Sequence, residues 1–158
     1  MPIPTLKLFL LLLGPLAAAA QTTPTLPPKQ ANVAVVQTAD SVQATYHQVG
    51  QVLVAAGYNL DLANYDTQKL HGTLAYITTI DRDLPAYPAM RVALRASLSA
   101  AGSGTAVELR GTYTLDGLHR LPIANRGSQG SPAAAAWTEL RRVAALFSSG
   151  TTAYRRER

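Results

Sequence analysis

The clearest hydrophobic pattern in the chain is an alternation of apolar and polar side chains over residues 91–99 and 105–115. A period of two predicts β-strands that bury one face and leave the other in water, which is typical of an antiparallel sheet. The small residues 100–104 between the strands predict a hairpin. A register in which paired residue numbers sum to 203 aligns the apolar rows and sets Arg95 against Glu108. The expected inward residues are Val92, Leu94, Ala96 and Leu98, then Val107, Leu109, Tyr113 and Leu115.

Two further stretches carry apolar residues at the three- and four-residue spacings of an α-helix. The first helix is expected to start at Asp40, which fits a capping box with Gln43, and to end at Gly57. The second is expected to start at Ser131 and to end at Gly150. The expected buried stripes are Val42, Tyr46, Val49, Leu53 and Ala56 in the first helix and Trp137, Leu140, Val143, Ala144 and Phe147 in the second.

Shorter signals complete the expected fold. Residues 33–36 are rich in valine and predict a first strand, and residues 70–80 predict another strand before the alternating pair. Residues 59–66 are mostly polar and are expected to form a connection. The order is strand, helix, three-strand antiparallel meander, helix. The sequence therefore predicts an α+β domain with both helices on one face of the sheet.

The N-terminus has the pattern of a signal peptide. Lys7 precedes an apolar run that ends in four alanines, which fits cleavage near Ala20. The apolar residues 8–20 are fewer than the roughly 20 that span a bilayer, so we expect no transmembrane segment in the mature form. We expect residues 1–20 to be a cleaved signal, 21–32 a Pro/Thr-rich linker, 33–150 a single domain and 151–158 a short basic tail. The predicted location is periplasmic or extracellular.

The charge of the chain is concentrated near its C-terminus. The net charge is +5, and loss of Lys7 with the signal peptide leaves +4. Residues 120–158 hold seven arginines against two glutamates, a pattern that is most often a solvated helix face and a solubilising tail. The functional alternative is contact with an anionic envelope surface such as phospholipid headgroups or lipopolysaccharide, and nucleic acid is not expected as a partner. The candidate binding residues are Arg120, Arg126, Arg141, Arg142, Arg155 and Arg156.

Catalytic signatures are weak in this chain. It has no cysteine, no G-x-S-x-G elbow, no phosphate loop, no H-E-x-x-H pair and no dinucleotide fingerprint. We therefore expect no metal or other cofactor. Two hypotheses remain. The first is an exported, non-catalytic accessory or binding module that recognises an envelope protein or an anionic envelope surface. The alternative is a small exported hydrolase whose site combines His71 or His119 with Asp81 or Asp83.

Overall fold

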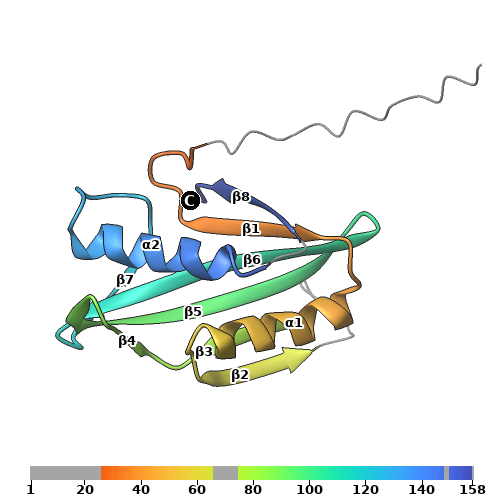
Figure 1. The fold of residues 1–158 in the computed structure, drawn as a ribbon, viewed down its shortest axis with the longest axis horizontal. Coiled ribbons are helices and arrows are strands. Elements are labelled where there is room, and N and C mark those ends of the chain that lie inside the picture. Colours follow the sequence, from red (N-terminus) through yellow and green to blue (C-terminus); the bar gives the residue numbers. More distant parts are fainter. Residues whose placement is uncertain (1–25, 66–74, 148–149, 158) are drawn as a thin grey trace, which may run out of the picture.

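The computed structural model describes residues 26–65, 75–147 and 150–157. Within them, eight strands form one antiparallel sheet and two helices pack on it, so the predicted α+β class is confirmed (Figure 1). The elements are β1 (Val33–Thr38), α1 (Val42–Ala55), β2 (Leu60–Tyr65), β3 (Ala75–Thr79), β4 (Arg82–Leu84), β5 (Tyr87–Ala101), β6 (Gly104–Leu115), β7 (His119–Pro122), α2 (Pro132–Ala144) and β8 (Thr151–Arg155). The sheet order is β2-β3-β5-β6-β1-β8, with β4 beside β5 and β7 beside β6. Neither described helix is long and apolar enough to cross a membrane.

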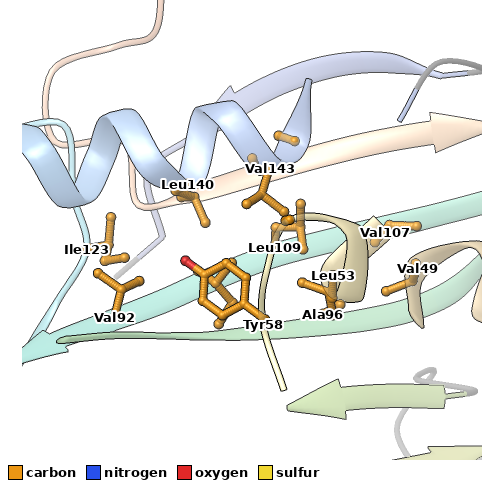
Figure 2. Packing of buried hydrophobic residues seen from close by; sticks show 14 of the residues in the cluster. Val49, Leu53, Tyr58, Val92, Ala96, Val107, Leu109, Ile123, Leu140 and Val143 are labelled. Carbon is orange, nitrogen blue, oxygen red and sulfur yellow. The ribbon is translucent and has the colours of Figure 1, made fainter. Parts of the chain in front are cut away.

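The core lies between the sheet and the two helices. Figure 1 shows α1 and α2 in front of the sheet, and Figure 2 shows their buried side chains directed toward those of β5 and β6. All four predicted inward residues of β5 are buried, as are three of the four in β6, whereas Leu115 is partly exposed. The opposite side chains of β5 and β6 therefore face away from the helices. This second surface is called the open face below.

Both helices have the predicted apolar stripes, but their ends differ from the prediction. Ser41, not Asp40, caps α1, because its hydroxyl accepts a hydrogen bond from the Ala44 amide. Gly57 follows the helix with a φ of 89°, which glycine adopts without strain. Ser131 caps α2 as predicted, but this helix ends at Ala144 and not near Gly150.

The predicted register of the β5–β6 hairpin is wrong by two residues. Paired residue numbers sum to 205, so Arg95 lies opposite Arg110 and not Glu108. The turn consists of two residues instead of the expected five, and its first residue, Gly102, has a φ of 59°. Gly104 then starts β6 directly against the backbone of Thr38, where a Cβ would lie 1.9 Å from the carbonyl oxygen. The tight turn thus extends both strands and sets their pairing.

Several segments expected outside the sheet belong to it. Most of the polar connection 59–66 forms β2, the expected tail 151–158 contains β8, and the predicted three-strand meander is part of a larger sheet. Each of these two strands pairs with one neighbour, β3 or β1, at an edge of the sheet. Backbone pairing holds them, although their side chains lack a strong apolar pattern.

The predicted signal peptide and the first part of the predicted linker lie outside the described residues, as do residues 70–74 of the predicted strand 70–80. The described part of that strand contains β3. The described end of the linker is not a free tether. Ala31 is fully buried, and the backbones of Gln30 and Ala31 exchange hydrogen bonds with Asn125. The Asn125 side chain also donates to the carbonyl oxygens of Pro27 and Pro28. These contacts attach the segment before β1 to the domain.

Candidate functional site

The six candidate arginines do not form one patch. Arg141 and Arg142 lie on α2, where Arg141 stacks on the ring of Tyr154 with its guanidinium carbon 5.9 Å from the ring centre. Arg155 lies on β8 and pairs with Glu108. The other three candidates are exposed: Arg126 in the loop before α2, Arg156 after β8 and Arg120 on β7. Of the six, only Arg120 lines a hollow on the open face of the sheet.

This hollow lies on the open face and has a volume of about 780 Å³. The hollow forms because side chains of different length lie in successive rows across neighbouring strands. A row of short side chains lies between two rows that carry arginines, so the middle of the surface is recessed. Rows on one face repeat every two residues, about 7 Å along a strand. In order, the rows are Arg95–Arg110, Ala93–Thr112 and Arg91–Thr114–Arg120.

The first row places two like charges opposite each other. Such a pair is unfavourable on a sheet unless other groups neutralise it. Arg110 is neutralised, since it forms ion pairs with Glu108 at 3.0 Å and with Glu157. Arg95 instead stacks on Tyr76, with 5.2 Å between the guanidinium carbon and the ring centre. Among the described residues, no carboxylate lies within 4.0 Å of the Arg95 guanidinium.

The third row is closer to neutral. Arg91 donates to Asp83 at 3.1 Å, and Arg120 donates to Asp81 at 2.8 Å. Both pairs are at least partly exposed, so they contribute little to folding stability, but each places a carboxylate beside its arginine. Of the four arginines that line the hollow, Arg95 is therefore the one without a carboxylate within 4.0 Å among the described residues, and Asp61 also lines the hollow.

A separate ion cluster surrounds Glu139 on α2. Its buried carboxylate accepts hydrogen bonds from the Tyr58 hydroxyl at 2.9 Å, from Arg82 at 3.0 Å and twice from Arg142 at 2.7 Å. Arg142 also donates to the carbonyl of Ala56 just after α1. This candidate arginine therefore joins α2 to the end of α1, and its guanidinium is already held by protein groups.

The Glu139 cluster shifts the pKa values of its members in the directions expected for a stable ion pair. Burial acts to raise the pKa of Glu139, but hydrogen bonds from Arg142 and Tyr58 and the two arginine charges outweigh burial and lower it. Burial and the Glu139 charge raise the pKa of Tyr58 well above its ordinary value. The carboxylate is thus held ionised and the phenol neutral. We interpret this cluster as a structural clamp.

The residues of the hydrolase alternative are only partly described. His71 lies outside the described residues, and His119 is exposed at the start of β7. Asp81 and Asp83 are engaged with Arg120 and Arg91. No hydrogen bond between described residues joins a histidine to a carboxylate. Within the same residues, no group of three or more His, Cys, Asp or Glu side chains is arranged to hold a metal ion.

The central residues of the hollow were not among the predicted candidate residues. The alternation of residues 91–99 and 105–115 places Arg91, Arg95 and Arg110 on the faces opposite the apolar rows, but the three were not predicted as a site. The available signal was the presence of arginines at mid-strand positions of two strands joined by one hairpin. Comparison with known proteins adds no relative: neither a model of a protein family nor a curated protein matches the chain.

Proposed function

We propose that this protein is an exported, non-catalytic binding module that holds an anionic group in the hollow of its open face. The observation that carries the proposal is the position of Arg95. It lies opposite Arg110, and no carboxylate of the described residues lies within 4.0 Å of its guanidinium. An anion beside Arg95 would neutralise its guanidinium and could accept charge-assisted hydrogen bonds from it and from Arg110 opposite.

The chemistry of arginine supports binding more than proton transfer. A guanidinium stays protonated at physiological pH and presents a planar set of donors that matches a carboxylate or a phosphate. The volume of about 780 Å³ falls within the range of roughly 300–1,000 Å³ that is common for small-molecule sites. The target that fits both the site and the predicted export is an anionic component of the cell envelope.

The anion site can be tested by amide NMR titration of the chain that begins at Gln21, which contains every described strand and helix. Sodium acetate and inorganic phosphate serve as separate probes. We expect shifts centred on Ala93, Arg95 and Thr112, and an affinity about ten-fold weaker in Arg95→Gln, because one charge-assisted hydrogen-bond donor is lost. High salt should weaken binding further.

The matched control is Arg156→Gln, which removes the same charge from an exposed arginine outside the lining of the hollow. This variant should keep the affinity of the parent protein. Shifts centred on α2 or on Arg156, or equal losses of affinity in both variants, would show that net charge and not the hollow attracts the anion.

The export part of the proposal rests on the pattern of residues 1–20. When the chain is produced in a bacterium with its own N-terminus, we expect it in the periplasmic or extracellular fraction. Its intact mass should correspond to a chain beginning at Gln21. A full-length chain confined to the cytosol would contradict export without affecting the anion site.

A further inference from the structure

We infer that the ligand of the hollow is a free amphiphile with one anionic head and one apolar chain. This inference rests on the proposed function, since it takes the Arg95–Arg110 pair as the site of the head. It adds three properties of the ligand: it carries one negative charge, its alkyl chain lies along the apolar side of the hollow, and it binds as a monomer and not as part of a membrane.

The distribution of charge indicates one anionic group. At the far end of the hollow, Asp83 and Asp81 already neutralise Arg91 and Arg120. A second anionic group there would have to displace a carboxylate or lie beside one. At the other end, Arg110 already pairs with Glu108 and Glu157, and Asp61 also lines the hollow, but Arg95 has no carboxylate within 4.0 Å among the described residues. This end therefore offers one guanidinium without an ion-pair partner in the described part of the chain. The site therefore favours a monoanionic head over a dianion.

The rest of the lining is suited to an apolar chain. Beyond the arginines and acids, the accessible apolar border of the hollow comes mainly from Ile80, Ala93 and Pro122. Ile80 follows β3 at the rim of the hollow, and its side chain is 51% exposed. Leu62 extends this surface, because β2 pairs with β3 at Thr78, whose side chain lines the hollow, and Leu62 is one of the exposed large apolar residues. Apolar surface continuous with a charged recess is typical of a binding site rather than of scattered exposed residues.

The recessed form of the site favours a single molecule over a membrane surface. The floor, Ala93 and Thr112, lies below two rows of long side chains. A flat array of lipid headgroups would meet the arginines at the rim first and leave the apolar lining uncovered. A monomeric amphiphile can place its head between Arg95 and Arg110 and lay its chain along the Ile80 side.

A series of carboxylates of increasing length tests this inference. Hexanoate, octanoate and decanoate are titrated below their micelle concentrations into the chain that begins at Gln21. Because a buried methylene favours association by a fixed increment, each added CH₂ should lower Kd by about two- to four-fold. Isoleucine methyl NMR gives a readout of position, since residues 21–158 contain three of the four isoleucines in the sequence. The signal of the exposed Ile80 should shift, whereas those of Ile77 and Ile123, whose side chains belong to the core, should not.

Two substitutions distinguish contacts with the alkyl chain of the ligand from contacts with its carboxylate. Ile80→Ser should weaken decanoate at least five-fold and hexanoate by a smaller factor, because the longer chain buries more apolar surface along the Ile80 side of the hollow. The control Leu118→Ser alters an exposed leucine outside the hollow and should change neither. Arg95→Gln should weaken all three carboxylates by about the same factor, and decanol should bind more weakly than decanoate.

The outcomes distinguish the two proposals. Equal Kd values for all three carboxylates, with loss of binding in Arg95→Gln, would overturn the amphiphile and leave the anion site standing. Length-dependent binding that is unchanged in Arg95→Gln would overturn both. Binding to vesicles that contain phosphatidylglycerol, without binding to monomeric decanoate, would also overturn the inference, because the ligand would then be a membrane surface.

Discussion

Replacement of Glu139 by alanine tests whether the ion cluster clamps α2 to the rest of the fold. The carboxylate is the common acceptor for a phenol and two guanidinium groups, and its side chain is 7% exposed. Its donors come from three places: Tyr58 follows α1, Arg82 lies in β4 and Arg142 lies one turn further along α2. Removal of the carboxylate leaves all three donors without this acceptor.

The expected loss of folding free energy depends on how exposed each of the three donors is to water. The buried Tyr58 hydroxyl would remain unsatisfied, which costs about 1–2 kcal/mol. The Arg82 side chain is 28% exposed and loses a partly buried charged hydrogen bond worth about 1 kcal/mol. The Arg142 side chain is 44% exposed, so its ion pair is discounted to about 0.5 kcal/mol. We therefore expect Glu139→Ala to lower the free energy of unfolding by about 3 kcal/mol.

Urea unfolding followed by circular dichroism measures this loss. With a slope of about 2 kcal/mol per molar urea for a domain of this size, the midpoint should fall by about 1.5 M. Glu139→Gln adds a test by pH, because it removes the charge and keeps the shape. The folded-state pKa of Glu139 is lowered, so its contribution is present above the unfolded pKa of about 4.3 and is lost as the pH falls through the folded pKa.

The difference in stability between the parent protein and Glu139→Gln should accordingly be full at pH 7 and shrink below about pH 4. The control is Asp83→Asn, which removes a carboxylate that is 72% exposed and should cost less than about 0.5 kcal/mol. The reasoning is refuted if Glu139→Ala costs no more than this control. It is also refuted if the Glu139→Gln difference is the same at pH 7 and pH 3.

Three further predictions concern the fold. Gly111→Ala should cost about 1–3 kcal/mol in urea unfolding, because its Cβ would lie 2.7 Å from the Ile123 methyl group; an unchanged midpoint would show that the core adapts. Ser131→Ala should cost about 1 kcal/mol through loss of the α2 cap, whereas Ser131→Asp should keep most of the stability of the parent protein. Equal stability of Ser131→Ala and the parent would contradict a role for the cap. Truncation after Gly150 removes Thr151–Arg155 and exposes the edge of β1, so size-exclusion chromatography should show aggregation; a stable monomer would contradict the assigned role of β8.

Local patterns in the sequence predict much of this fold because their physical basis is local. Side chains alternate along any strand, so the buried faces of β5 and β6 could be read from residues 91–99 and 105–115 without knowledge of their partners. The stripes of both helices and the cap at Ser131 follow in the same way from helix geometry. Asp40 and Ser41 are adjacent residues of similar capping ability, and this explains the error of one position at the start of α1.

Edge strands are set by partners that are distant in the sequence. The residues of β2 and β8 have no strong apolar alternation, since each strand lies at an edge and is held by backbone pairing to β3 or β1. Nothing in residues 60–65 or 151–155 alone identifies those neighbours. Similarly, the Glu139 clamp joins Tyr58, Arg82 and Arg142 only because the sheet and both helices bring them together.

The residues that meet at the candidate site could not be predicted from the sequence, because they depend on the register of β5 and β6. A shift of two residues in the β5–β6 register leaves every side chain on the same face, so the hydrophobic pattern cannot distinguish a sum of 203 from one of 205. The first register would neutralise Arg95 with Glu108, whereas the observed one places it opposite Arg110. The sequence by itself determined which residues face water. The tight turn at Gly102 and the contact of Gly104 with β1 decided which of them meet, because pairing across strands depends on tertiary geometry.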